Sequence, residues 1–337
     1  MKAVALTRYL PIEDAQSLFD VELPDPKPTG RDLLVAVQAI AVNPVDTKVR
    51  APKDKVEPQP RVLGYDASGI VQAVGPDVTL FKVGDEVFYA GDITRPGTNS
   101  QLHLVDERIV GRKPKSLNFA EAAALGLTAI TAYEGLFDRI GLDVNGSDKG
   151  KTLLIIGGAG GVGSIAIQLA KIAGQTVITT ASRPETIAWV RKLGADHVIN
   201  HRDPLRPQLE ALGFTNADNV FVLNDTDQHW DAAADIVAPQ GTVGLIVENK
   251  GPLDQGVAKS KSVRLAWEMM FARAMYKTPD MIEQHNLLNR ISGWIDDGTL
   301  QTTANKAISP INAANLRAAH KALEHGSAIG KIVLEGW

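Results

Sequence analysis

The chain has 337 residues, which is enough for two domains because single domains usually hold about 100–200 residues. Its formal net charge is −4, so there is no electrostatic reason to expect a nucleic acid or an anionic membrane as a partner. The chain contains no cysteine, which excludes disulfides, iron–sulfur clusters and cysteine-ligated zinc. It also lacks a His-Glu-x-x-His motif. In the segment Met1–Arg8 the apolar run is too short for a signal peptide and is interrupted by a charge at Arg8. We therefore expect a cytoplasmic protein.

The first third of the sequence is typical of a small β-barrel. Residues 1–8 resemble an opening strand, and Leu33–Val42 and Ala67–Val74 alternate apolar with polar or small residues. Glycine and proline punctuate the intervals between these segments. Short strands separated by such turns predict a partly open barrel.

The pattern changes at Asn118, which forms a predicted capping box with Glu121 and opens an alanine-rich helix. Strands and helices then alternate, which predicts a doubly wound parallel α/β sheet. The predicted strands are Thr152–Ile156, Thr176–Thr180, His197–Asn200, Asn219–Leu223 and Thr242–Val247, and the predicted helices are Ser164–Ala173 and Pro184–Leu193.

The tail is predicted to return to the first domain. Helical spacing covers Asp280–Asp297 and Ala313–His325, and a last strand covers Lys331–Glu335. Because the Rossmann-type sheet is already complete, this strand is expected to pair with the barrel. The predicted domains are therefore 1–123 with 265–337, and 124–264. Thr242–Val247 is the expected edge strand of the second sheet, covered by a second copy in a homodimer.

A glycine-rich turn between a buried strand and a helix is the most informative motif. Gly158-Ala159-Gly160-Gly161-Val162-Gly163 follows Thr152–Ile156 and precedes Ser164–Ala173, which is where a dinucleotide fingerprint stands. One glycine allows the tight turn, one lets the backbone approach a pyrophosphate, and one lets helix and strand pack closely. The free N–H groups of the helix then face the phosphate charge.

The residues after the second strand favour NADPH over NADH. A NAD-selective site ends this strand with a carboxylate that holds the ribose 2′-hydroxyl. Here the strand is followed by Ser182 and Arg183, a hydroxyl and a guanidinium that suit a 2′-phosphate, whereas Glu185 is expected to start the next helix. Alternatively, Arg183 is an ordinary solvated residue and the site accepts both cofactors.

Several segments together resemble the medium-chain dehydrogenase/reductase superfamily, and within it the zinc-free quinone oxidoreductase (zeta-crystallin-like) branch. The segments that carry the resemblance are Asn43–Asp46, Val62–Asp66, Val83–Val87, Ala122–Ala129, Gly157–Gly163, Lys192–Asn200 and Gly330–Leu334. The resemblance runs nearly end to end. It implies a chaperonin-10-like barrel domain and a Rossmann domain, with the active site in the cleft between them.

The resemblance also implies that neither catalytic nor structural zinc is present. Zinc-dependent alcohol dehydrogenases of the superfamily place a cysteine ligand where this chain has Asn43 and a histidine ligand where it has Tyr65. A zinc ion polarises an alcohol oxygen. Without it, reduction of quinones or α,β-unsaturated carbonyls remains feasible, because these acceptors delocalise the incoming negative charge.

Site roles follow from the resemblance residue by residue. Asn43 and Tyr65 line the substrate side, where they either hydrogen-bond the substrate oxygen or serve as a turn residue and a packed aromatic. Thr128 is expected near the nicotinamide. His201 and Lys331 either face the cofactor or are ordinary surface residues. The segment Trp267–Tyr276 is predicted to form helix core or, less readily, a lid over an apolar substrate.

The activity expected from these features is NADPH-dependent reduction of a quinone or enone. The alternatives are an activity like that of zinc-type alcohol dehydrogenases, and a non-catalytic NADPH-binding protein.

Overall fold

The computed structural model describes residues 1–326 and 328–337. The chain folds as two units, one formed by Met1–Ile130 and Phe271–Trp337 and the other by Thr131–Met270. Each unit has its own sheets and its own buried core.

The first unit is built from two sheets, whose strand pairs are antiparallel except for the parallel pair of β15 and β16. Among the described residues, β2, β1 and β4 form a small sheet, and β15, β16, β3, β5, β6 and β8 follow one another in a larger one, with β7 also on β3. These strands are β1 (Lys2–Tyr9), β2 (Phe19–Glu22), β3 (Asp32–Ala41), β4 (Lys53–Val62), β5 (Ala67–Val74), β6 (Glu86–Tyr89), β7 (Leu102–Asp106), β8 (Val110–Arg112), β15 (Ala304–Ile308) and β16 (Lys331–Glu335).

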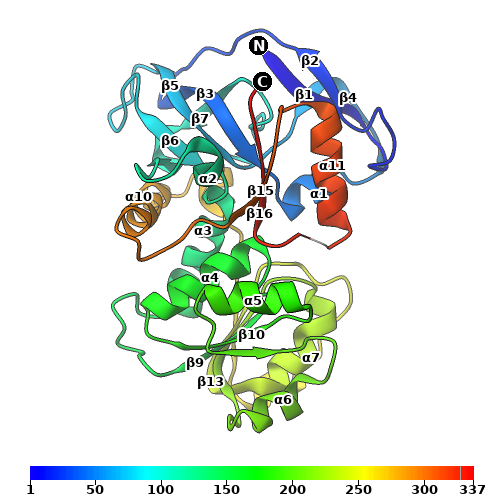
Figure 1. The fold of residues 1–337 in the computed structure, drawn as a ribbon, viewed down its shortest axis with the longest axis vertical. Coiled ribbons are helices and arrows are strands. Elements are labelled where there is room, and N and C mark those ends of the chain that lie inside the picture. The colour runs from blue at the N-terminus through cyan, green and yellow to red at the C-terminus, as the bar shows by residue number, and fades with distance from the viewer. Residues whose placement is uncertain (327) are drawn as a thin grey trace. The chain divides into compact units, whose positions relative to one another are not determined.

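Strand β16 pairs antiparallel with β3, which confirms that the last strand returns to the first unit. The helices of this unit are α1 (Pro44–Arg50), α2 (Phe119–Ala123), α9 (Ala272–Met275), α10 (Glu283–Asp296) and α11 (Ala313–Glu324), with the short 3₁₀ turn η1 (Glu107–Ile109). Helix α11 lies beside α1 (Figure 1). The predicted capping box opens α2, because Asn118 and Glu121 each accept the other's backbone N–H.

The second unit holds a parallel sheet in the order β11-β10-β9-β12-β13-β14. Its strands are β9 (Thr152–Ile156), β10 (Thr176–Thr180), β11 (His197–Ile199), β12 (Ala217–Val222), β13 (Val237–Leu245) and β14 (Arg264–Trp267). Its helices are α4 (Gly161–Ile172), α5 (Pro184–Lys192), α6 (Leu205–Ala211), α7 (Thr226–Ile236) and α8 (Gly256–Ser260). The predicted doubly wound sheet is therefore confirmed.

The connection into the second unit is helical. Helix α3 (Gly126–Tyr133) runs directly into the π-helical segment η2 (Glu134–Ile140). Of the helices that the structure describes, none has the length and hydropathy that crossing a bilayer requires.

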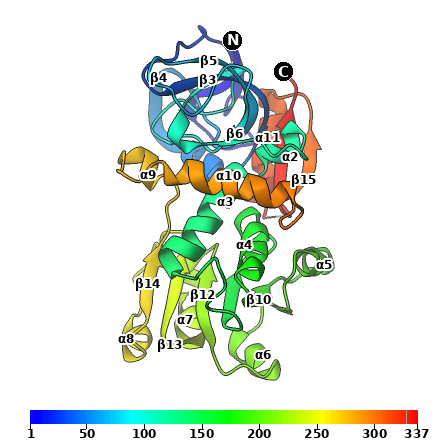
Figure 2. The same ribbon diagram turned by 90° about the vertical axis from the view of Figure 1, so that its left-hand side faces the viewer.

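The edge strand was predicted wrongly. Strand β13 has β14 on its outer side, so β14 forms the edge, as Figure 2 shows at one side of the second unit. The sheet thus continues to Trp267, past the predicted boundary at residue 264. Trp267–Tyr276 is also not one core helix, because it ends a strand, passes through a turn and forms the short α9, with Trp267, Met269 and Tyr276 exposed.

Candidate functional site

The glycine turn has the geometry that the sequence predicts. Strand β9 is buried along its whole length and ends at Ile156, and helix α4 begins at Gly161 with Gly160 as its N-cap. The first N–H groups of a helix have no acceptor within that helix, so α4 presents donors and the positive end of its dipole at this turn. This is a cradle for a phosphate anion.

The three fingerprint glycines have different packing roles. A Cβ on Gly163 would lie 2.4 Å from the carbonyl oxygen of Gly157, and one on Gly158 would lie 1.9 Å from Thr179 Oγ1 on β10. Both glycines are therefore required for close packing of the turn against its neighbours. Around Gly160, by contrast, the nearest atom is 3.5 Å away, which leaves room for a ligand to approach the backbone. The residues present fit a dinucleotide pyrophosphate.

Ser182 and Arg183 follow β10, as predicted, and both are half-buried. Arg183 is the N-cap of α5, and Glu185 lies in the first turn of that helix. Arg183 Nε lies 3.0 Å from Glu185 Oε1, so the guanidinium already has an anionic partner. His201 is half-buried in the turn after β11, and this burial lowers the pKa of His201.

A buried polar cluster occupies the first unit, and Lys331 lies at its centre. The Lys331 ammonium donates to Asp66 Oδ2 at 2.8 Å, to the Val42 carbonyl oxygen at 3.0 Å and to Asn43 Oδ1. Lys331 is only 3% exposed, so the alternative of a solvated strand residue is wrong. Its three N–H donors have three acceptors here; a contact with the cofactor stays a prediction.

Asn43 and Asp66 complete this cluster. Asn43 Nδ2 donates to Asp66 Oδ2 at 2.8 Å and to the Tyr65 carbonyl oxygen at 3.4 Å. Asp66 Oδ1 accepts the backbone N–H of Leu127, in the first turn of α3, at 2.6 Å. Burial raises the pKa of Asp66, and the Lys331 ammonium opposes that shift. Both ends of the Asn43 amide are thus engaged inside the protein.

Asp46 packs beside this cluster at the start of α1. Its Oδ2 accepts the backbone N–H of Asn43 at 2.6 Å. Its Oδ1 is buried and has no hydrogen-bond partner among the described residues. Burial raises the pKa of Asp46 to about 7, so this group is partly protonated near neutral pH.

Tyr65 and Thr128 are also buried in the first unit. The Tyr65 ring packs edge-on against Phe271, with ring centroids 5.4 Å apart, and burial raises the pKa of its hydroxyl. The Thr128 hydroxyl lies 3.2 Å from each of two backbone oxygens of the preceding turn, those of Ala124 and Leu125. The predicted nicotinamide contact of Thr128 stays a prediction.

The residues at the positions of the zinc ligands do not fit a zinc ion. Zinc prefers thiolate, imidazole and carboxylate donors. Here an amide and a phenol stand at those positions, and an ammonium already pairs with the nearest carboxylate. In the part of the chain that the structure describes, no three histidine or acidic side chains gather in a way that could hold a metal.

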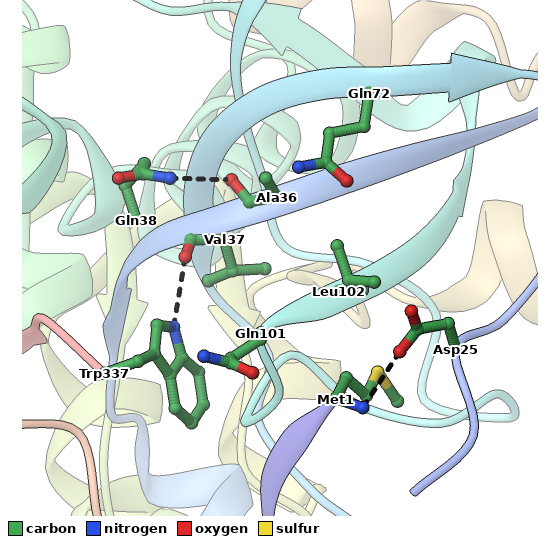
Figure 3. A pocket seen from close by; sticks show the side chains of 9 residues that line it. All are labelled: Met1, Asp25, Ala36, Val37, Gln38, Gln72, Gln101, Leu102 and Trp337. Atoms are coloured by element: carbon green, nitrogen blue, oxygen red, sulfur yellow. Dashed lines mark hydrogen bonds and ion pairs between the residues drawn. The ribbon is translucent and has the colours of Figure 1, made fainter.

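An open cavity of about 490 Å³ lies elsewhere on the first unit (Figure 3). Gln38, Gln72 and Gln101 line it together with Trp337, whose indole N–H donates to the Val37 carbonyl oxygen at 3.1 Å. None of the predicted site residues lines this cavity.

The sequence indicated Asn43 and Tyr65 separately but missed the cluster around Lys331. The local signal was the Asn-Pro-Val-Asp run, in which an aspartate three residues after the N-cap returns a hydrogen bond to it. Nothing local links this run to Lys331, because 288 positions separate that lysine from Asn43.

Two family models match the chain. The model described as an alcohol dehydrogenase GroES-like domain matches residues 29–115, and the one described as a zinc-binding dehydrogenase matches residues 161–283. A zinc-type alcohol dehydrogenase-like protein of Staphylococcus epidermidis is 42% identical over 336 residues, with 99% of each chain covered. The 2-methylene-furan-3-one reductase of Solanum lycopersicum is 37% identical over 257 residues, covering 73% of this chain and 62% of its own.

Solved structures of alcohol dehydrogenase-like and quinone oxidoreductase proteins are similar to this chain over nearly its whole length. A Rhizobium etli protein named after zinc-dependent alcohol dehydrogenases is 54% identical with a TM-score of 0.95, covering 100% of this chain and 98% of its own. The quinone oxidoreductase of Coxiella burnetii is 28% identical with a TM-score of 0.82, covering 100% and 99%. Mycobacterial Rv1454c, solved with NADPH, is 26% identical with a TM-score of 0.84, covering 99% and 100%. The chain therefore belongs to the medium-chain dehydrogenase/reductase superfamily of oxidoreductases, in the branch that holds quinone oxidoreductases and zinc-type alcohol dehydrogenase-like proteins.

Proposed function

We propose that this oxidoreductase uses NADPH to reduce a quinone or an α,β-unsaturated carbonyl compound, and that it does so without zinc. The observation that carries this proposal is the cluster around Lys331. It places a buried cation against Asn43, the position at which the family resemblance implies a zinc ligand in zinc-dependent relatives. A site without a Lewis acid favours acceptors that can delocalise negative charge by themselves.

The second unit supports the choice of cofactor. The glycine turn and the N-terminus of α4 would hold the pyrophosphate, and Ser182 with Arg183 would hold the 2′-phosphate. The side chains of the Arg183–Glu185 pair are 32% and 56% exposed. Such an exposed pair is weak, so a phosphate dianion can displace Glu185 from the guanidinium. Bound NADPH would supply a hydride.

The first unit supports the role of the remaining residues. We assign Tyr65 to hydrogen-bond the substrate oxygen on which negative charge develops, because a phenol is a good neutral donor. Asn43 is assigned a positioning role, since both ends of its amide already have partners next to Tyr65. Asp66 and Lys331 would then hold the Asn43 amide in place.

A turnover assay tests the proposal. Purified enzyme should oxidise NADPH in the presence of 1,2-quinones, 1,4-quinones or 2-alkenals, with simple alcohols inactive as substrates with NADP⁺. Metal analysis should find the active protein free of zinc. Near-stoichiometric zinc that survives mild chelation would overturn the zinc-free reading. NADPH binding without turnover of any acceptor would favour the non-catalytic alternative.

We also propose that the protein is a homodimer joined through β14. This edge strand exposes Leu265 and Trp267, and the exposed Met269 follows two residues later, so one side of the edge is apolar. An exposed apolar edge strand has unpaired backbone groups that can hydrogen-bond to a strand of another chain. A monomeric mass in light scattering at micromolar concentration would contradict the dimer, and Leu265→Lys should dissociate it.

A further inference from the structure

Two buried glutamates of the second unit face one arginine. Glu134 is the first residue of η2, and Glu268 directly follows the last residue of β14. Arg139, further along η2, has its Nε 2.8 Å from Glu268 Oε2 and its Nη2 3.8 Å from Glu134 Oε2. The side chains of both glutamates are only 1% exposed, whereas that of Arg139 is 33% exposed. We call Glu134 and Glu268 the carboxyl pair.

The carboxyl pair has one more acidic group than its arginine can neutralise. If both groups were ionised, one buried negative charge would be left without a cation. Such a charge is costly, so the group takes up a proton instead. Glu268 Oε1 is buried and has no hydrogen-bond partner among the described residues, which also favours a neutral carboxyl group. Burial, together with repulsion from Glu134, raises the pKa of Glu268, and Arg139 opposes that shift. The pair therefore holds one proton near neutral pH.

The other charged groups on the neighbouring elements lie away from this pair. Segment η2 packs against β13, β14 and α4, and β13 carries no charged side chain. The remaining charged groups of these elements are Asp138 of η2 and Arg264 of β14, which are both exposed, and Lys171 of α4, which pairs with Asp196. Glu134 and Arg139 are therefore the charged neighbours that act on the Glu268 carboxyl group.

Glu268 lies at the edge of the sheet where the cofactor is proposed to bind. Its backbone N–H donates to the carbonyl oxygen of Leu245, the last residue of β13, at 2.9 Å. Strands β9, β12, β13 and β14 are parallel neighbours, so Glu268 lies at the same edge as the glycine turn after β9.

The strand order indicates which end of the cofactor this position faces. Sheets with this order bind a dinucleotide across the carboxyl ends of their strands, with one mononucleotide on each half. Ser182 and Arg183, proposed for the 2′-phosphate of the adenosine half, follow β10. The nicotinamide half then falls to β12, β13 and β14, which stand side by side in Figure 2.

We propose that the carboxyl pair exchanges a proton with solvent in step with the charge of the nicotinamide ring, keeping the proton beside NADPH and losing it beside NADP⁺. This inference rests on the proposed function. Reduction of the acceptor takes a hydride from NADPH and a proton from solvent, and it leaves a positive charge on the ring. A positive charge favours the ionised form of a carboxyl group, and the effect reaches further where water is excluded. The pair regains its proton from solvent when NADPH replaces NADP⁺, so each turnover leaves it unchanged.

Calorimetry of cofactor binding tests the proposal without turnover. We would titrate NADP⁺ and NADPH into wild type at pH 7.5 in HEPES and in Tris, whose ionisation enthalpies differ. The difference in binding heat between the buffers gives the number of protons released. NADP⁺ should release more protons than NADPH, by up to about one proton per site. Both cofactors carry the same 2′-phosphate, so its own titration cancels in this comparison.

The affinity for NADP⁺ should depend on pH for the same reason. The pKa of the pair is expected to be lower in the NADP⁺ complex than in the free protein, and a proton leaves on binding at pH values between the two. In that window the Kd for NADP⁺ should fall as pH rises, by up to about tenfold per pH unit. The ratio of the Kd values for NADP⁺ and NADPH isolates this effect.

Two glutamine variants locate the proton. Glu268→Gln leaves one carboxylate, that of Glu134, for one guanidinium, and Glu134→Gln leaves Glu268 in the same balance. Each variant should therefore abolish the difference in proton release between NADP⁺ and NADPH. Asp138→Asn is the matched control, because it removes an exposed carboxyl group from the same segment and should keep the difference. Thermal unfolding of each variant shows whether the fold is retained.

The outcomes are distinct. If neither cofactor binds to wild type, the proposed function fails, and this inference fails with it. If both bind and release equal numbers of protons, only the role of the carboxyl pair is overturned. If the difference remains in either glutamine variant, the proton comes from another group, and the inference is again overturned. Loss of the difference in both glutamine variants, with its retention in Asp138→Asn, is the expected result.

Discussion

The glycine turn of the second unit and the Lys331 cluster of the first are built in opposite ways. The turn is made of backbone from one stretch, residues 157–163, and its donors are main-chain N–H groups. The cluster is made of side chains from segments far apart in sequence, and 265 positions separate Lys331 from Asp66. A backbone site depends on small residues at fixed places, whereas a side-chain site depends on a balance of buried charges.

The largest expected effect comes from unbalancing the cluster. Lys331→Met removes the buried cation and leaves the Asp66 carboxylate without its ionic partner. Breaking a buried ion pair from one side costs about 3–5 kcal/mol, so the free energy of unfolding should fall by about that amount in urea denaturation. Lys321→Met, in an exposed pair with Glu13 on the same unit, should cost about 0–1 kcal/mol. Equal losses for the two variants would contradict the importance of burial here.

A smaller effect is expected from filling the glycine turn. Gly163→Val would force a side chain against the backbone of Gly157 and Gly158, so we expect a loss of about 3 kcal/mol in stability and no measurable binding of NADPH. Gly160→Ala is the matched control, since its Cβ has space. It should keep the unfolding free energy and lose only cofactor affinity in calorimetry. Full NADPH affinity in Gly163→Val would show that the turn does not hold the cofactor.

The third prediction concerns pH and the cluster. The pKa of Asp46 is about 7 in the folded protein, above its value of about 4 in the unfolded chain. The folded state therefore binds the extra proton, and this contribution to stability is complete below pH 4 and is lost as pH rises through 7. Asp46→Asn should remove this pH dependence of the unfolding free energy. Between pH 5 and pH 8 the unfolding free energy of the variant should therefore rise relative to that of wild type by on the order of 2 kcal/mol.

The quantity to compare is the difference in unfolding free energy between Asp46→Asn and wild type, because other titrating groups cancel in it. His103 is such a group: it is buried and its pKa is lowered to about 4, so its contribution to stability is lost as pH falls below about 6.5. This loss changes the unfolding free energy of both proteins alike. Urea denaturation at each pH gives the difference between variant and wild type. A difference that does not change with pH would show that Asp46 titrates normally.

The smallest expected effect returns to the second unit. Arg183→Ala removes one charged ligand of the proposed 2′-phosphate, so the preference for NADPH over NADH should fall about tenfold, or ~1.4 kcal/mol. The quantity to measure is the ratio of kcat/KM for the two cofactors. NADH kinetics serve as the internal control, because NADH has no 2′-phosphate. An unchanged ratio would remove Arg183 from the cofactor site.

Local patterns predicted the second unit well. The strand Thr152–Ile156 and the strand Thr176–Thr180 have the bounds that apolar runs and glycine turns indicated. The return of Lys331–Glu335 to the first unit also followed, because β16 is apolar and no place in the other sheet remained for it. Such features rest on periodicity and on glycine geometry, and both are local.

Features that depend on distant pairing were missed. Strand β14 is only four residues long with exposed side chains, so it lacks the apolar run that marks a buried strand. Helix α7 was also missed, although its N-cap Asp225 is a local signal that could have found it. The burial of Lys331 could not be predicted, since a lysine in a strand is ordinarily solvated unless a carboxylate elsewhere in the chain meets it.

The pairing of β16 with β3 has a consequence for biosynthesis. During translation, Asp66 leaves the ribosome 265 residues before the lysine that neutralises it, at synthesis rates of about 5–20 residues per second. Residues 131–270, which make the whole of the second unit, emerge in that interval. The first unit therefore has an open position beside β3 until its final strand arrives, so the second unit is the first of the two that a nascent chain can complete.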